Sequence, residues 1–205
     1  RMEIAGKIGG DQDDLTLKDG SASLNGTTIA VMDLLKGDAI EANGKIKPGD
    51  MSDEVTQATY GAFFAEVAVN AYTGETRVRR MTGVFGIGRV LNHKTATSQC
   101  YGGMIWGIGS GLTEELVFDD RDGHLVNHDL AEYHVPVNLD VPRIDVSFVE
   151  ERDQHANPLQ AKGVGELGIC GAAGSIANAI YNACGVRVRD FPITLDKILE
   201  KLPPA

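Results

Sequence analysis

The sequence predicts an α+β fold, in which a mixed and mainly antiparallel sheet is packed by a long glycine-rich helix and a shorter C-terminal helix. Three patterns lead to this prediction. Residues 62–81 alternate as two strands around Thr73-Gly74, apolar residues within 94–116 recur at three- and four-residue steps, and 172–184 have helical spacing that ends at Gly185. Strands and helices alternate without a regular repeat, which argues against a doubly wound parallel sheet.

Composition and charge exclude several function classes. The 205 residues carry a formal net charge of -10, which repels phosphate backbones and anionic lipid, so we expect neither nucleic acid nor membrane as a partner. The least charged stretch, 95–113, contains too many polar residues and glycines for a membrane helix. Three cysteines without a C-x-x-C pair argue against a disulfide scaffold or a zinc ribbon. Glycine accounts for 25 of the 205 residues, more than its usual share of roughly 7%, and this suggests close approach of the backbone to a cofactor.

Residues 1–59 are predicted to be a turn-rich connecting segment. Asp19-Gly20 separates two short alternating stretches and predicts a hairpin. Thr27-Thr28 is suited to cap a short helix over 29–35, and a second hairpin is expected around Asn43-Gly44.

Residues 60–205 are predicted to form the main domain. The strand at 62–70 returns as a second strand at 75–81, which leads into a glycine-rich bend at 83–88. Further strands are expected at 144–149 and at 186–193. The residues expected to face inward are Phe63, Ala65, Val67 and Val69 in the first strand and Ile144, Val146 and Phe148 in the third.

The helix predicted over 94–116 carries Gly103, Gly107 and Gly111 on one side. Each glycine costs about 1 kcal/mol relative to alanine in a helix interior. Three on one side therefore predict very close packing against backbone or a rigid ligand. Tight packing of the helix on the sheet is the simpler interpretation.

Two patterns are weak signals of chemistry. Among His124, His128 and His134, the first two would share a face only in a helix. The hairpin turn predicted at 119–123 and Pro136 after the histidines favour a loop, so no metal ligand is predicted. Residues 163–168 match G-x-G-x-x-G, yet loop-like residues precede them, and the strand and acidic residue of a dinucleotide site are missing.

Glu166 is the only charged residue between Lys162 and Arg187, and it lies among glycines that lead into a helix near Ala172. Free N–H groups at such a helix start suit an anionic group. Desolvation among small apolar residues would raise the pKa of Glu166 and suit it to act as a base or an acid. Equally, Glu166 is compatible with an exposed loop residue that caps an amide.

The segment 162–168, with 172–180 and 185–194 after it, resembles the C-terminal end of the molybdenum hydroxylases. These are the large cofactor-binding subunits of xanthine dehydrogenases and aldehyde oxidases. Within the family, three-subunit bacterial aldehyde oxidases are the best match, followed by xanthine dehydrogenases.

A second motif supports the resemblance. Val90-Leu91-Asn92, with 99–103 and 106–109, is similar to the second pterin-contacting helix of that family. The two motifs occur in the family's order, and the similarity covers about residues 60–199. It implies that 60–205 are the second molybdenum-cofactor-binding domain of a larger subunit.

The resemblance implies hydroxylation of aldehydes or N-heterocycles with water-derived oxygen, Glu166 being the base on the molybdenum-bound hydroxyl. It implies a molybdenum–molybdopterin cofactor, expected in the cytosine dinucleotide form, and no direct metal ligand from this chain. The implied cofactor contacts are Arg89, Val90, Leu91, Asn92, His93, Lys94, Thr95, Gln99, Lys162, Gly163, Val164 and Gly165.

Large subunits of this family are several times longer than 205 residues. We therefore expect partners in the remainder of the large subunit and in subunits or domains that carry 2Fe-2S and FAD, and no activity from this chain alone. Two alternatives stay open: a non-catalytic binding or assembly module of the same fold, and a nicotinamide enzyme that uses 163–168. The substrate and the compartment, periplasm or cytoplasm, are left open.

Overall fold

The computed structural model describes residues 1–45 and 54–203. The chain divides into two compact units, Arg1–Gly49 and Asp50–Ala205, called unit 1 and unit 2 below. Both strands and helices are present, and most strand pairs are antiparallel, which confirms the predicted α+β class. Across the described ranges, no helix is both long and apolar enough to cross a membrane.

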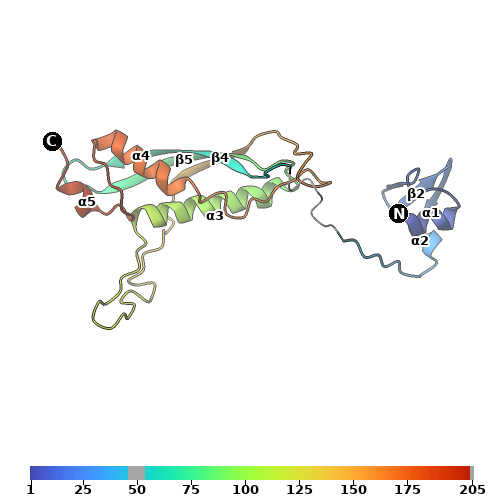
Figure 1. The fold of residues 1–205 in the computed structure, drawn as a ribbon, viewed down its shortest axis with the longest axis horizontal. Coiled ribbons are helices and arrows are strands. Elements are labelled where there is room, and N and C mark those ends of the chain that lie inside the picture. The colour runs from blue at the N-terminus through green and yellow to red at the C-terminus, as the bar shows by residue number, and fades with distance from the viewer. Residues whose placement is uncertain (46–53, 204–205) are drawn as a thin grey trace. The chain divides into compact units, whose positions relative to one another are not determined.

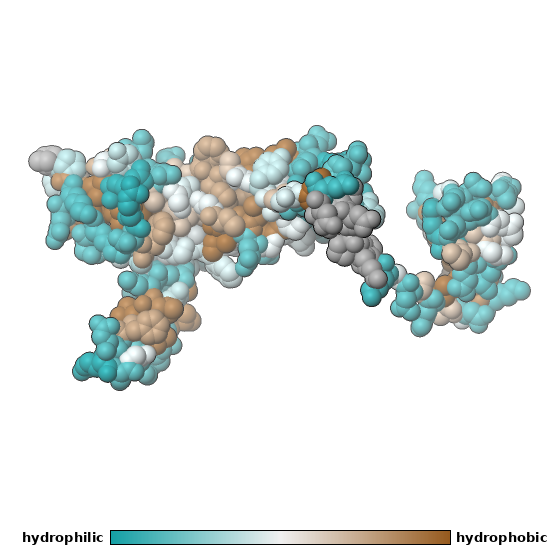
Figure 2. Space-filling model, viewed as in Figure 1, coloured by the Kyte–Doolittle hydropathy of each residue, from teal (hydrophilic) through white to brown (hydrophobic). Residues whose placement is uncertain are grey.

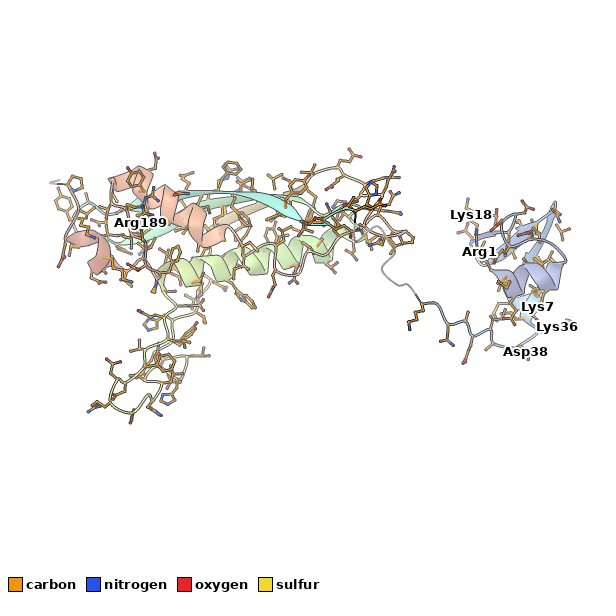
Figure 3. All side chains as sticks on the ribbon, viewed as in Figure 1. Arg1, Lys7, Lys18, Lys36, Asp38 and Arg189 are labelled. Carbon is orange, nitrogen blue, oxygen red and sulfur yellow. The ribbon has the colours of Figure 1, made fainter. Side chains whose placement is uncertain are left out.

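Unit 1 is a three-stranded antiparallel sheet with two short helices. Its elements in chain order are α1 (Met2–Ile8), β1 (Thr16–Lys18), β2 (Ser21–Leu24), β3 (Thr27–Ala30) and α2 (Val31–Leu35). The small core consists of Ala5, Leu15, Ala22 and Leu24. The labelled charged side chains of this unit, Arg1, Lys7, Lys18, Lys36 and Asp38, are exposed (Figure 3).

The hairpin predicted at Asp19-Gly20 is confirmed, with positive φ angles of 48° and 76° at the turn. The predicted start of the second helix is wrong. Asn25-Gly26 forms another tight turn, so Thr27–Ala30 pairs with β2 and the helix begins only at Val31. Around Asn43-Gly44, residues 40–45 are irregular, and the rest of the expected hairpin lies outside the described residues.

The sheet of unit 2 has the order β4 (Tyr60–Val69), β5 (Thr76–Gly86) and β6 (Arg143–Phe148). β4 and β5 are antiparallel, whereas β5 and β6 are parallel. The inward faces predicted for the first and third strands are confirmed, because those residues pack against the core. The bend predicted at 83–88 begins later, since β5 continues through Gly86.

Two helices pack on this sheet and complete the core (Figure 1). α3 (His93–Leu112) contacts β5, β6 and α4 (Ala172–Cys184), and α4 lies on β4. The core residues from the helices are Ala96, Cys100, Met104, Ile108, Ala172, Ile176 and Ile180. Burial raises the pKa of the Cys100 thiol to about 11, so this group stays protonated and acts as a core side chain.

The glycine side of α3 lies against backbone, as the glycine spacing predicted. A Cβ on Gly103 would lie 2.7 Å from the carbonyl carbon of Gly168, and one on Gly107 would overlap the Cβ of Ala172. The surface opposite is therefore the chain that leads into α4 and the first residues of α4 itself, so the simpler interpretation, packing on the sheet, is wrong for these positions.

The last predicted strand, 186–193, is irregular. Val186 and Ile193 are buried, but Pro192 has no N–H, and the N–H of Ile193 donates to Gly111 O at the end of α3. This segment therefore covers the core without joining the sheet. The short helix α5 (Leu195–Leu199) follows it.

Residues 113–142 form an irregular arm between α3 and β6 (Figure 1). At its base, Thr113 Oγ1 donates to His134 O and Tyr133 Oη donates to Glu114. These contacts replace the last helical turn expected at 113–116, so α3 ends at Leu112. The turn predicted at 119–123 is confirmed by the bridge between Phe118 and Leu125. Apolar side chains gather on the arm (Figure 2).

Gly107→Ala is expected to lower the free energy of unfolding of unit 2 by about 1–2 kcal/mol. Overpacking costs roughly 1–3 kcal/mol, and better helix propensity returns up to about 1 kcal/mol. Gly102→Ala is the matched control, because a Cβ there meets no heavy atom within 4 Å. The control is expected to be neutral or stabilising in chemical denaturation, and equal shifts in both variants would contradict the packing argument.

Candidate functional site

Two segments that are far apart in the sequence cross at one end of unit 2. Gly88 and Ala161 form an antiparallel bridge. On either side of it, Arg89 N–H donates to Gln160 O over 2.7 Å and Lys162 N–H donates to Ile87 O over 2.8 Å. Gly88 has a φ of 66°, and a Cβ there would collide with Gln160 O. The crossing therefore requires glycine at position 88.

The first two turns of α3 hold the segment 160–166 in place. Asn92 is the N-cap, and its side chain accepts the N–H of Thr95 over 3.2 Å. Two turns along the helix, Gln99 Nε2 donates to Gly165 O over 2.6 Å. The structure thus brings the two predicted motifs, 89–99 and 162–166, side by side.

Most of the predicted cofactor contacts line one hollow of about 430 Å³. Its lining includes Arg89, Leu91, Asn92, Thr95, Gln99, Lys162, Val164 and Gly165. Gly163 lines neighbouring hollows instead. Val90 packs against the core, the His93 ring lies 6.0 Å from the Phe148 ring between centroids, and Lys94 is exposed.

Glu166 lines an adjacent hollow of about 550 Å³ together with Tyr60, Phe63, Gly163 and Gly165. Gly165 borders both hollows, so the hollow of Glu166 adjoins the one at the start of α3. The Glu166 side chain is nevertheless exposed. The desolvation expected from its small neighbours is therefore not provided by the described residues of this chain.

Lys162 differs from the other predicted contacts because its charge is already paired. Its side chain is only 8% exposed, and Nζ lies 2.9 Å from Glu151 Oε1 and 3.5 Å from Asp153 Oδ2. The hydrogen bond to Glu151 raises the pKa of Lys162. Neither acidic residue was singled out from the sequence, where the sole signal is the acidic stretch 150–153.

The remaining donors suit an anionic group. The amides of Gly163, Val164 and Gly165 have no hydrogen-bond acceptor within the described ranges, and a Cβ on either glycine would stand in open space. Arg89 and Lys94 are exposed and form no ion pair in the described part of the chain. Free backbone amides beside a helix N-terminus and two cations fit a phosphate or pyrophosphate.

The weaker candidates do not form a site in the residues described. His124 and His128 lie in the arm with their ring centroids 6.0 Å apart. No group of three metal-ligating side chains is found in 1–45 or 54–203. Residues 163–168 follow an isolated bridge rather than a strand and continue as turns up to α4, which differs from a dinucleotide-binding turn.

Comparison with known proteins gives one family and several longer relatives. The molybdopterin cofactor-binding domain family matches residues 2–142. The aldehyde oxidoreductase molybdenum-binding subunit PaoC of Escherichia coli K12 is 49% identical over 204 residues, which are 99% of this chain and 28% of that protein.

Two solved structures are similar. Aldehyde oxidoreductase from Desulfovibrio desulfuricans ATCC 27774 superposes with a TM-score of 0.64 at 35% identity, over 71% of this chain and 16% of that one. Quinoline 2-oxidoreductase from Pseudomonas putida 86 has a TM-score of 0.76 over 98% of this chain and 28% of its own, and at 24% identity it shows the fold alone. The chain thus spans less than a third of each relative.

Asn92→Ala is expected to destabilise the start of α3 by about 1 kcal/mol, because the N–H of Thr95 loses its acceptor. Asn92→Asp retains a cap oxygen and serves as the matched control. Amide hydrogen exchange of residues 93–99 measures the effect. Faster exchange in the alanine variant with protection kept in the aspartate variant is expected, and equal exchange in both would contradict the capping role.

Proposed function

Since the chain belongs to the molybdopterin cofactor-binding domain family, we propose that it is part of the molybdenum-binding subunit of an aldehyde- or N-heterocycle-hydroxylating oxidoreductase. The match confirms the resemblance to molybdenum hydroxylases. The 49% identity to PaoC, whose name states an aldehyde oxidoreductase, supports the substrate class. The observation that carries the proposal is the crossing of 87–99 with 160–166, which places free amides beside the start of α3.

In this proposal the crossing holds the phosphate-bearing end of a molybdopterin dinucleotide, in the cytosine form. The amides of 163–165 and the first turn of α3 donate to phosphate oxygens, and Arg89 and Lys94 add positive charge. Asn92, Thr95 and Gln99 fix the helix and the loop, whereas Val90 and His93 anchor the helix start to the core.

Glu166 is the proposed base. When bound, the molybdenum cofactor supplies the two-electron redox chemistry that oxidises the substrate carbon. The Glu166 carboxylate accepts the proton of the water-derived nucleophile as it attacks that carbon, which requires hydrogen-bond distance to the proton. Because Glu166 is exposed in this chain, the remainder of a subunit as long as PaoC has to cover it and exclude water.

Partner proteins follow from the same proposal. Electrons leave the site through 2Fe-2S and then FAD carried by partner subunits or domains, and the name of PaoC, a molybdenum-binding subunit, agrees with such an assembly. The exposure of Glu166 also favours one other candidate, a non-catalytic assembly module of the same fold in which this residue has no chemical role.

Glu166→Gln in the complete enzyme separates the two candidates. We expect a fall in kcat of about 10²–10⁴-fold, the usual cost of losing a general base, with unchanged molybdenum content. Glu200→Gln is the matched control, since Glu200 is an exposed carboxylate at the end of α5. Steady-state kinetics and elemental analysis give the two readouts. Activity within about tenfold of the wild type favours the assembly module.

The 205-residue chain alone is expected to retain no molybdenum and no activity. It supplies one wall of the site, because Gly163, Gly165 and Glu166 are exposed. Elemental analysis of the purified chain checks this expectation. Stoichiometric molybdenum would show that these residues are sufficient for binding and would contradict it.

A further inference from the structure

One carboxylate touches both segments of the crossing. Glu151 follows β6 in the chain, and its Oε1 accepts a hydrogen bond from Lys162 Nζ over 2.9 Å. Its Oε2 accepts the N–H of Gly88 over a longer 3.4 Å. Gly88 directly precedes Arg89 and Lys162 directly precedes Gly163, so Glu151 joins the two segments where each enters the site.

The three charged side chains of this contact are largely buried. The side chains of Lys162, Glu151 and Asp153 are 8%, 25% and 18% exposed, and the Lys162 ammonium lies 5.4 Å from the centre of the Tyr60 ring. A largely buried ammonium is unfavourable unless carboxylates compensate it. Lys162 is therefore constrained to stay between Glu151 and Asp153 and cannot turn toward the hollow without losing both.

The loop that leads to the site is irregular, and the side chain of Asn157 holds it internally through hydrogen bonds to Leu159 and Ala161. Residues 149–160 belong to no helix or strand. The backbone bonds of the crossing are confined to Ile87, Gly88 and Arg89 on one side and 160–162 on the other. The Lys162–Glu151 ion pair closes this loop at its two ends, and loop closure by a buried contact restricts the conformations of the residues it joins.

We propose that Glu151, through its ion pair with Lys162, is a positioning residue of the cofactor site. It fixes where the amides of 163–165 stand relative to the first turn of α3, so that both donate to one bound group. The identity of that group rests on the proposed function, whereas the fixing of the two segments does not.

Glu151→Gln in the complete enzyme tests the proposal, because it keeps the side-chain shape and removes the charge. Hydrogen exchange of peptides covering 86–90 and 160–165 is expected to accelerate roughly tenfold, as a charge-assisted hydrogen bond is weakened. The kcat per bound molybdenum is expected to fall about 10–100-fold, with KM for the aldehyde unchanged within about twofold, because Glu151 acts on the position of the cofactor site.

Two further variants keep the test decisive. Glu150→Gln is the matched control, since the neighbouring carboxylate is exposed and forms no ion pair within the described residues. Lys162→Met is expected to have the same effects on exchange and kcat as Glu151→Gln. Lys162→Arg keeps the charge and is expected to retain most of kcat and of the exchange protection.

Each outcome decides between the roles. Unchanged exchange in Glu151→Gln overturns the proposal. A lower melting temperature and molybdenum content with unaltered kcat per molybdenum also overturns it, because that result describes a merely structural ion pair. Failure of the proposed function is separate: if Glu166→Gln is fully active while Glu151→Gln accelerates exchange at 86–90 and 160–165, the fixing of the two segments is supported and the assigned chemistry is not.

Discussion

The backbone contact between α3 and the chain entering α4 is the constraint on which the site depends. A Cβ at Gly168 would lie 2.8 Å from Cys100 O, and one at Gly103 would meet the backbone of Gly168 in return. Because neither side carries a side chain, the helix and the loop approach directly. This approach brings Gln99 within 2.6 Å of Gly165 O. Gly103 of the helix and Gly168 of the loop, which look like two separate features in the sequence, therefore act together: they let the loop lie directly on α3.

The attraction of the site for an anion depends on which of its cationic groups are already paired. The chain carries a net charge of -10, so an anion meets a repulsive field overall and has to be attracted locally. Lys162 contributes little to that attraction because two carboxylates neutralise it. What remains are Arg89, Lys94 and the free amides of 163–165. Backbone amides cannot change ionisation state or rotate away, so an anion held mainly by them is held by the fold itself.

Local patterns in the sequence predicted the local structure well. Alternation in 62–81 predicted both long strands and the inward face of the first, and the turn residues Asp19-Gly20 predicted the first hairpin. The glycine spacing of α3 predicted a backbone contact but not its partner, because periodicity states which side is bare and not what lies opposite. The segment 186–193 alternates like a strand, yet it lacks a sheet neighbour and bonds to the end of α3. The Glu151–Lys162 pair was missed for a similar reason. Ion pairing across a loop leaves no periodic trace, and only the folded crossing shows which carboxylate reaches the lysine.

Glu166 and the apolar side chains of the arm are both exposed, and both would be expected to lie under other protein. A general base, the role proposed for Glu166, works efficiently where bulk water is excluded, yet this residue lies at an exposed position. On the arm, Leu130 and Leu139 are 78% and 84% exposed, and contiguous exposed apolar surface is unfavourable in water unless another surface covers it. A further layer of protein over unit 2 would satisfy both conditions at once: it would bury the apolar arm and enclose the carboxylate. PaoC, of which this chain matches 28%, is long enough to provide that layer. Under the proposed function, unit 2 would fix the positions of the site's donors, and the covering layer would decide which substrate reaches them.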